Sequence, residues 1–289
     1  MNALAEAFEK LPGIGKGVYA PADFEAVRKI VHATAGIVLV PGKAMLVYSR
    51  LAPLVRNTGC GTFAAYVKRI EADDAERRRA ICALTTNHTF FFREDHHFDH
   101  LGKSVRPGLL KRASAGDPVR IWSAGCSSGE ETWSILMTML GTDRGAAARL
   151  GAGDFLLLAT DLADHALATA EAAQYRSDTL DAVPGELRRA WMREADGQAT
   201  VADEARALVR FKSLNLLGDW PMTRAFDVIF CRNVMIYFDH ATKERLVDRF
   251  ARQLAPGGHL YIGHSERVTG PAERVLTQVG PTIYRKDAE

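Results

Sequence analysis

Short apolar segments alternate with helical segments from Val119 onward, and this alternation constrains the fold more than any other feature. The runs VRIWSAG, FLLLATD and FDVIFCRN each resemble a strand, and helical segments such as EETWSILMTML and LADHALATAEAAQY lie between them. Strands that are apolar along their whole length are buried on both faces, as in a parallel sheet covered by helices. The sequence therefore predicts an α/β domain over residues 86–289. In its last part a PGG turn, a strand in HLYIGHS and a closing strand in TIYRK are expected.

The first 85 residues have a different pattern. Apolar residues recur at nearly 3.6-residue spacing over positions 24–31, which predicts a helix with Asp23 as its N-cap and Gly36 at its end. A second helix contains Pro53, and we expect it to kink or restart there because proline lacks an amide hydrogen. Since residues 1–85 contain no strand pattern, they are predicted to form an all-α domain.

Composition narrows the classes of function. The 289 residues suit two domains, and 37 basic against 35 acidic residues give no general case for a nucleic-acid partner. The four cysteines form no C-x-x-C pair, which is typical of reduced thiols in the cytoplasm. No segment approaches the roughly 18–20 apolar residues of a membrane span, and residues 1–10 do not resemble a signal peptide. We therefore expect a cytoplasmic protein without direct membrane insertion.

The segment IWSAGCSSGEE leads from a buried strand through a glycine-rich turn into a helix. Gly125 and Gly129 would let the backbone approach a ligand closely, and the helix start offers free N–H groups. This is the loop geometry of nucleotide cofactor sites. The dinucleotide motif G-x-G-x-x-G and the phosphate-binding G-K-[ST] are both absent here. An ordinary strand-to-helix turn is the alternative.

Polar side chains follow the next two apolar runs. Asp161 ends FLLLATD, where a carboxylate can accept hydrogen bonds from both ribose hydroxyls, although Asp161 and Asp164 could instead cap the following helix. Arg232 and Asn233 follow FDVIFC, at the edge where open α/β sheets bind ligands. Burying such a pair is costly without partners, and an ordinary surface loop is the alternative.

The segment NHTFFFRE lies at the junction of the two regions, where ligands often bind. Its three phenylalanines could equally dock the domains against each other. The nearby histidines His96, His97 and His100 could share a helical face, but a zinc site also needs a distant ligand. We therefore favour solvated histidines and expect no metal.

Together these segments resemble the chemotaxis receptor methyltransferase family, CheR. The resemblance covers the chain from about Phe24 to Arg285 and is carried by TTNHTFFFRE, RIWSAGCSSGEETWSI, LLATDLADHAL, LNLL, FDVIFCRNVMIYF and LAPGGHLYIGHSE, in that order. It implies an N-terminal all-α receptor-recognition domain (residues 1–85). It also implies a Rossmann-like, S-adenosylmethionine-dependent methyltransferase domain (residues 86–289) with a small β-subdomain inserted at about residues 180–211.

The resemblance implies methyl transfer from S-adenosylmethionine to glutamate side chains of chemoreceptors, with S-adenosylhomocysteine as the other product. Arg93 and Tyr237 should lie near the transferred methyl. By motif position the cofactor-binding residues should be Asn87, Thr89, Arg93, Gly125, Glu130, Asp161, Asn215, Leu216, Arg232 and Asn233.

The chemistry of this reaction agrees with the sequence. A glutamate carboxylate, with a pKa of about 4.3, is already a nucleophile at neutral pH, so no general base is required. A nicotinamide dehydrogenase is disfavoured by the missing G-x-G-x-x-G motif. A cofactor-binding scaffold or sensor of the same fold without turnover is a further alternative.

The receptor partner suggests roles for the helical domain and the insertion. Residues 24–70 contain seven basic residues and one acidic residue, a local charge of +6, which would steer a Glu-rich receptor bundle. The family's receptor-binding residues correspond to Lys43, Arg50 and Arg56. In the insertion, the pair Asp196-Gly197 suits a tight hairpin without a glycine-rich peptide-binding loop. In some members of the family the subdomain at this position carries a glycine-rich loop and binds a tethering pentapeptide at the far C-terminus of the receptor. We therefore expect a member that does not depend on such a receptor pentapeptide.

Overall fold

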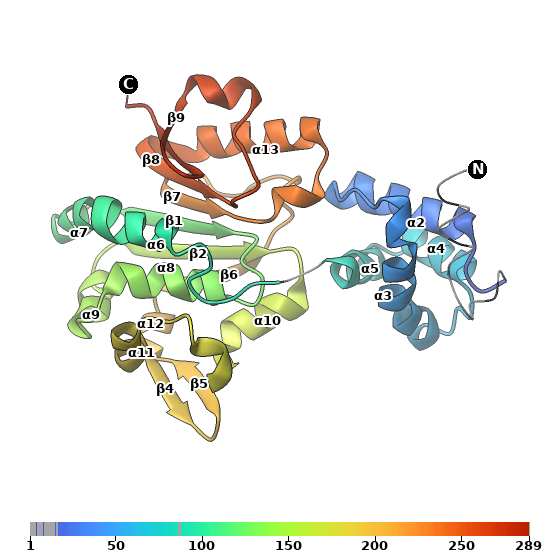
Figure 1. Cartoon of the computed structure of the whole chain (residues 1–289), viewed down its shortest axis with the longest axis horizontal. Helices are drawn as coiled ribbons and strands as arrows, with labels where there is room; N and C mark the ends of the chain where they lie inside the picture. Colours follow the sequence, from blue (N-terminus) through green and yellow to red (C-terminus); the bar gives the residue numbers. More distant parts are fainter. Residues whose placement is uncertain (1–3, 5–7, 9–14, 16, 86–87, 289) are drawn as a thin grey trace. The chain divides into compact units, whose positions relative to one another are not determined.

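The computed structural model describes residues 4, 8, 15, 17–85 and 88–288 of the chain. The chain divides into two compact units (Figure 1). The first consists of residues 1–86 together with residues 237–239, and the second of residues 87–236 and 240–289. Residues 237–239 thus belong to the first unit, although the residues on both sides of them in the sequence belong to the second.

The first unit is helical over its described residues. Its buried side chains come from every helix and include Phe24, Leu51, Phe63 and Tyr66, so each helix presents one apolar face to a shared core. The elements are α2 (Pro21–Ala35), the 3₁₀ turn η1 (Pro41–Lys43), α3 (Ala44–Asn57), α4 (Phe63–Ala72) and α5 (Asp74–Leu84).

Two details of these helices differ from the sequence predictions. The N-cap of α2 is Ala20, and Asp23 lies one turn inside the helix, where its carboxylate accepts a hydrogen bond from the Ala20 amide at 2.8 Å. Of the expected kink or restart at Pro53, the restart was wrong, because α3 continues through this residue, and the kink stays a prediction. Pro53 and Ser49 are both exposed, so the Ser49 carbonyl that loses its helical partner is open to hydration. Gly36 does end α2, in the left-handed conformation.

The second unit is built on a seven-stranded sheet with the order β6-β2-β1-β7-β8-β10-β9. The first five strands in this order run parallel, and β10 pairs antiparallel with both β8 and β9. This confirms the predicted α/β class. The strands are β1 (Val119–Ala124), β2 (Phe155–Asp161), β6 (Val209–Ser213), β7 (Phe226–Cys231), β8 (Leu254–Ile262), β9 (Leu276–Gly280) and β10 (Ile283–Lys286).

Helices cover both faces of this sheet (Figure 1). On one face Ile121 and Phe230 share a buried cluster with Trp133 of α8. On the other, Trp122 packs edge-on against Phe250 of α13, with ring centroids 5.4 Å apart. The helices are α6 (His96–His100), α7 (Arg106–Ser114), α8 (Glu130–Leu140), α9 (Gly145–Gly151), α10 (Asp164–Ala172), α11 (Gly185–Trp191), α12 (Asp203–Arg206) and α13 (His240–Gln253). The short turns are the π-helical η2 (Leu101–Val105) and the 3₁₀ turns η3 (Ser177–Leu180), η4 (Met235–Tyr237) and η5 (Gly270–Arg274).

A smaller antiparallel sheet of order β3-β5-β4 lies beyond α10, with strands β3 (Gln174–Arg176), β4 (Met192–Ala195) and β5 (Gln198–Val201). Its extent differs from the expected range 180–211, because β3 precedes that range and β6, which begins inside it, belongs to the large sheet. Asp196 and Gly197 join β4 to β5 with φ of 52° and 73°. These left-handed values are typical of a two-residue type I′ turn, which confirms the predicted hairpin.

The expected PGG turn, residues 256–258, instead lies inside β8, where the register with β7 shifts between Phe226 and Val228. The parallel strands end together at one edge of the large sheet, and several of the predicted cofactor-binding residues lie at these strand ends or just after them. None of the helices in the described ranges is both long enough and apolar enough to cross a membrane.

Candidate functional site

The glycine-rich loop after β1 is bonded to the end of β2. The amides of Gly125 and Cys126 donate to the Thr160 carbonyl at 2.7 and 2.9 Å. The Ser127 amide donates to Oδ2 of Asp161 at 2.8 Å. The structure therefore brings together two features that the sequence places more than 30 residues apart, the glycine-rich loop and the acid at the end of β2.

Both loop glycines are required by the protein's own packing. Gly125 has φ of 83°, and a Cβ there would lie 2.4 Å from Cγ2 of Val234, in the loop after β7. Gly129 has φ of 96°, and its Cβ would lie 2.7 Å from Cβ of Ala170 on α10 and 2.9 Å from the hydroxyl of Tyr175. The nearest atoms thus belong to the loop after β7, to α10 and to the small sheet, whereas the sequence pattern predicts that the glycines admit a ligand.

Asp161 connects two backbone segments. Besides accepting from Ser127, its carboxylate accepts a hydrogen bond from the Ala163 amide at 2.8 Å through Oδ1. The N-cap of α10 is Ala163, so neither Asp161 nor Asp164 is the cap residue itself. Burial raises the pKa of Asp161 above its ordinary value. A carboxylate offers about four lone-pair sites, so Asp161 keeps acceptor capacity beyond these amide bonds.

The two acids that begin α8 have different environments. Glu130 accepts a hydrogen bond from the Ser128 hydroxyl at 2.7 Å, at the electropositive start of the helix. Glu131 is buried, accepts from the Ser123 hydroxyl at 2.8 Å, and lies 3.3 Å from Nη1 of Arg232. Burial raises the pKa of both acids. The sequence analysis selected Glu130 and missed Glu131.

The loop after β6 contains the predicted pair Asn215 and Leu216. Its turn is closed by hydrogen bonds from the Leu217 amide to Oδ1 of Asn215 and from the Gly218 amide to the Asn215 carbonyl, both 3.0 Å long. Arg249 of α13 donates to the carbonyls of Leu216 at 2.8 Å and Gly218 at 2.6 Å. The sequence analysis did not identify Arg249, which fixes this loop from a distant helix.

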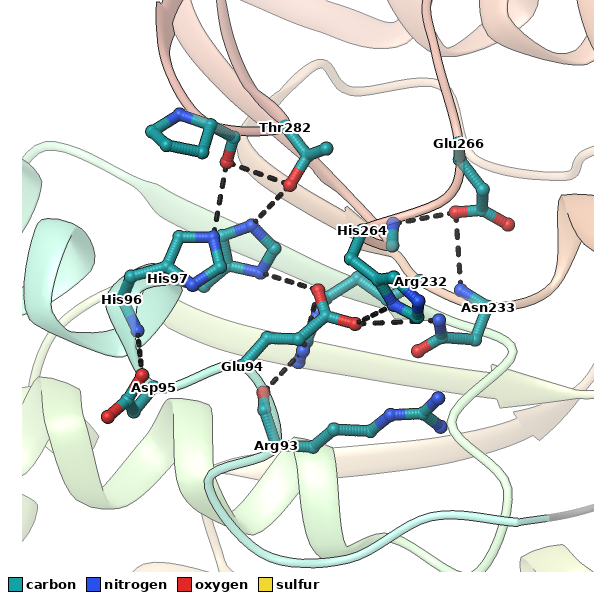
Figure 2. A network of polar contacts seen from close by, with 12 residues as sticks. Arg93, Glu94, Asp95, His96, His97, Arg232, Asn233, His264, Glu266 and Thr282 are labelled. Atoms are coloured by element: carbon teal, nitrogen blue, oxygen red, sulfur yellow. Dashed lines mark hydrogen bonds and ion pairs between the residues drawn. The ribbon is translucent and has the colours of Figure 1, made fainter.

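Arg232, at the end of β7, is buried with only 2% of its side chain exposed. Its guanidinium lies 3.3 Å from Oε2 of Glu131. It also lies 3.3 Å from Oε2 of Glu94 and donates a hydrogen bond to the Arg93 carbonyl (Figure 2). Asn233 follows in the left-handed conformation, with φ of 59°. The expected cofactor contact of Arg232 stays a prediction. Its observed contacts pair it with two glutamates and attach it to the backbone of Arg93.

The three phenylalanines before Arg93 belong to the second unit and do not act together. Phe91 is fully buried in the core of this unit, and Phe92 packs against Phe98 with ring centroids 5.0 Å apart. Phe90 is exposed and lies 5.7 Å from the Arg93 guanidinium carbon. Phe91 and Phe92 therefore pack within the second unit, and the alternative that the segment docks the two domains stays untested.

The remaining predicted residues of the methyl-transfer site are Asn87, Thr89 and Tyr237. Asn87 lies outside the described residues. Thr89 is half-buried in the loop before Arg93. Tyr237 belongs to the first unit, where its carbonyl accepts a hydrogen bond from the Val38 amide at 2.8 Å. Their roles stay predictions.

The histidines of α6 are structural. His97 is fully buried and pairs with the Thr282 hydroxyl at 2.9 Å, and its burial lowers its pKa to about 3. The interpretation of these residues as solvated was therefore wrong for His97. His96 pairs with the Pro281 carbonyl at 3.2 Å and His100 with the Tyr261 hydroxyl at 2.8 Å. Within the described ranges, no group of three or more His, Cys, Asp or Glu side chains is placed to hold a metal ion.

In the first unit, the predicted receptor-binding residues Lys43, Arg50 and Arg56 are all exposed. Arg50 has an additional role, because its Nη1 donates to the carbonyls of Ala83 at 3.2 Å and Thr85 at 3.1 Å. It thereby satisfies carbonyl groups at the C-terminal end of α5. Receptor binding by these three residues stays a prediction.

Comparison with known families gives matches over most of the chain. The family model described as "CheR methyltransferase, SAM binding domain" matches residues 87–284. A second model, described as "CheR methyltransferase, all-alpha domain", matches residues 22–85. The two matches cover the site at the sheet edge and the helical unit, respectively.

Individual relatives are similar over nearly their whole length. The "Probable chemotaxis protein methyltransferase" of Rhizobium etli is 45% identical over 262 residues, covering 89% of this chain and 96% of that protein. "Chemotaxis protein methyltransferase 2" of Pseudomonas aeruginosa is 38% identical over 273 residues, covering 92% and 93%. The "Chemotaxis protein methyltransferase" of Klebsiella aerogenes is 38% identical over 292 residues, covering 98% and 93%.

Proposed function

Because this chain belongs to the CheR methyltransferase family, we propose that it transfers methyl groups from S-adenosylmethionine to chemoreceptors during chemotaxis adaptation. The acceptors are glutamate side chains, which become glutamyl methyl esters, so the enzyme is a protein-glutamate O-methyltransferase. One structural observation supports the proposal in addition to family membership. The sheet edge that joins the glycine-rich loop to Asp161 also holds the backbone of Arg93 through Arg232.

The residues at this edge fit S-adenosylmethionine, which when bound supplies a methyl group activated by a sulfonium charge. Asp161 has acceptor capacity for ribose hydroxyls beyond its amide bonds. Glu130 is half-buried at the start of α8 and can accept from the amino group of the methionine portion. The loop of Asn215 and Leu216, fixed by Arg249, would border the adenine. Buried acids with raised pKa values favour a cationic ligand, because its charge stabilises their ionised forms.

Arg93 would bind the acceptor. It is half-buried, and its Nη1 donates to the His88 carbonyl at 3.0 Å. A guanidinium can hold a glutamate carboxylate through charge-assisted hydrogen bonds. Methylation removes the negative charge of the acceptor, so the ester loses this ion pair and is released. Catalysis then depends on alignment and on the exclusion of water, since the acceptor needs no general base. By the same resemblance we assign Tyr237 to the methyl-transfer site.

The helical unit would bind the receptor. Its exposed Lys43, Arg50 and Arg56 carry positive charge that complements a Glu-rich helical bundle, and such complementarity accelerates and orients association. Chemoreceptors would thus be the protein partner, with no nucleic acid involved. We also place the enzyme in the cytoplasm, which is supported by four cysteines that form no disulfide.

We further propose that this enzyme does not depend on a receptor pentapeptide. The hairpin of the small sheet closes with the two-residue turn Asp196-Gly197, which provides no extra loop to hold a peptide backbone. An added strand can still pair with a sheet edge, so a direct measurement is required. Titration of a receptor-tail pentapeptide should show no saturable binding below about 1 mM. Micromolar affinity would contradict the proposal.

The decisive experiment for the main activity uses receptor-containing membranes and S-adenosylmethionine labelled on the methyl group. The wild-type enzyme should incorporate label that alkali releases as methanol, because carboxyl methyl esters are base-labile. Receptors whose methylated glutamates are replaced by alanine provide the matched control. Cofactor binding without any base-labile incorporation would support the scaffold or sensor alternative and would contradict an enzymatic role.

A further inference from the structure

The backbone around Arg93 has an unusual conformation. The residues on either side of it, Phe92 and Glu94, have φ of 53° and 57°, in the left-handed region that non-glycine residues rarely adopt. Such conformations persist where the surroundings determine them, and they are frequent at functional sites. On the N-terminal side, the Phe92 amide is fixed by a hydrogen bond to the Ser134 hydroxyl at 2.9 Å.

On the C-terminal side, the loop is held by Arg232 and Glu94. Arg232 donates to the Arg93 carbonyl and lies with its guanidinium carbon 5.6 Å from the centre of the Phe98 ring. Oε2 of Glu94 lies 3.3 Å from Nη2 of Arg232, the same nitrogen that donates to the Arg93 carbonyl. The Glu94 carboxylate therefore orients the group that holds the Arg93 backbone.

The other oxygen of Glu94 connects two further segments (Figure 2). Oε1 lies 3.1 Å from Nδ1 of His264, which follows β8, and 3.5 Å from Nδ2 of Asn233, which follows β7. Only 12% of the Glu94 side chain is exposed. One carboxylate thus joins the Arg93 loop to the ends of two strands.

Glu94 is ionised in this setting. Burial alone would raise its pKa, but the Arg232 charge and the hydrogen bond from His264 hold the pKa below its ordinary value. The side chain of Arg93 extends away from this carboxylate (Figure 2), so the charge of Glu94 is directed at Arg232 and the charge of Arg93 is left for another partner.

We propose that Glu94 is a positioning residue for methyl transfer, an inference that rests on the function proposed above. In this proposal Glu94 acts through Arg232 and not directly on the cofactor or the acceptor. Through Arg232 it fixes the backbone of Arg93, and by pairing with Arg232 it leaves the Arg93 guanidinium available to the glutamate carboxylate. The left-handed conformation of Glu94 is what turns its carboxylate toward Arg232.

Glu94 can be replaced without leaving the buried Arg232 unpaired, so its role can be tested in a folded protein. Arg232 has a second carboxylate partner, Glu131, at 3.3 Å. Replacing Glu94 by glutamine therefore leaves the buried guanidinium paired, and glutamine preserves the size of the side chain. The adjacent Asp95 is exposed and accepts from the His96 amide at 2.8 Å, so Asp95→Asn removes an acid one residue away as a matched control.

Glu94→Gln should lower kcat for receptor methylation by at least about tenfold, while the Kd for S-adenosylhomocysteine stays within about threefold of wild type. Asp95→Asn should leave both within about twofold. The discriminating measurement repeats Glu94→Gln in an Arg93→Lys background. If Glu94 acts through Arg93, Glu94→Gln should lower kcat by no more than about twofold in the Arg93→Lys background, because coupled residues give non-additive effects. Equal losses in both backgrounds, or a Glu94→Gln variant as active as wild type, would overturn the proposal.

If Glu94→Gln fails to fold, His264→Gln decides instead, because His264 is 67% exposed and contacts Oε1 of Glu94. A kcat loss that disappears in the Arg93→Lys background would support the proposal, and an unchanged kcat would overturn it. If the wild-type enzyme forms no base-labile ester, the proposed function fails and this inference fails with it. If wild type and Glu94→Gln form ester at equal rates, the inference alone fails.

Discussion

Replacing Asp161 by alanine should weaken cofactor binding strongly and lower stability moderately. Two ribose hydroxyls would lose a charged acceptor, at about 1.5–3 kcal/mol each, so the Kd for S-adenosylhomocysteine should rise by at least about 100-fold. The amides of Ser127 and Ala163 also lose their acceptor, at about 1 kcal/mol each. For a chain of this size the Tm should therefore fall by about 4–8 °C, while the protein stays folded.

Calorimetric titration with S-adenosylhomocysteine, beside thermal denaturation, measures both effects. Asp164→Asn provides a control, because this neighbouring acid is exposed at the first position of α10 and its replacement should leave the affinity unchanged. Burial raises the pKa of Asp161, and its ionised form binds better, so the affinity of wild type should fall as the pH is lowered from 7 to about 5. Asp161→Asn should weaken this pH dependence. An Asp161→Ala affinity within twofold of wild type would refute the ribose assignment.

Four other predictions concern the acceptor, the loops and the receptor-binding face. Turnover at saturating substrates should be nearly flat from about pH 6.5 to 8.5, because the acceptor carboxylate is ionised throughout; a bell-shaped profile would reveal an acid or base. Gly125→Ala should destabilise the protein by about 2–4 kcal/mol in urea unfolding, from a Cβ at positive φ that overlaps Val234, and Val234→Ala should restore part of the loss. Arg249→Met should raise the cofactor Kd about fivefold to tenfold, since two hydrogen bonds to the loop after β6 are lost; an unchanged Kd would show that the loop needs no support. Arg56→Glu and Arg50→Glu should both slow receptor methylation without changing cofactor binding, but only Arg50→Glu should also lower the Tm, because Arg50 closes the end of α5.

The central strands could be predicted from the sequence, whereas the edge strands could not. β1 and β7 are buried at every position and are apolar apart from Arg120, Ser123 and Asp227, so each appears in the sequence as a nearly continuous apolar run. β6 lies at one edge of the sheet and alternates buried Val209 with exposed Arg210, and β9 at the other edge exposes three of its five residues. An edge strand has one hydrogen-bonded neighbour and more contact with solvent, so its hydrophobic signal is too weak to separate it from a loop.

The site was predictable to the extent that it depends on strand ends. Because the carboxyl ends of parallel strands meet at one edge, Asp161 and Arg232 could be expected near the glycine-rich loop. Their partners could not be identified, because Glu131 and Arg232 are separated by 101 residues and Glu94 and His264 by 170. In a sequence, a glutamate that pairs with a buried arginine looks the same as one that faces water.

The arrangement of charges at this edge resolves a conflict in the chemistry. In the proposed function, the positively charged cofactor is bound by acids, and the acceptor carboxylate is bound by a guanidinium. These acids and this guanidinium must not neutralise each other. Glu94 follows Arg93 directly in the chain, yet its carboxylate is directed to Arg232, which also pairs with Glu131. Arg93 itself is held by the uncharged carbonyl of His88. Its positive charge therefore remains uncompensated by this contact and is available to a substrate whose negative charge disappears in the reaction.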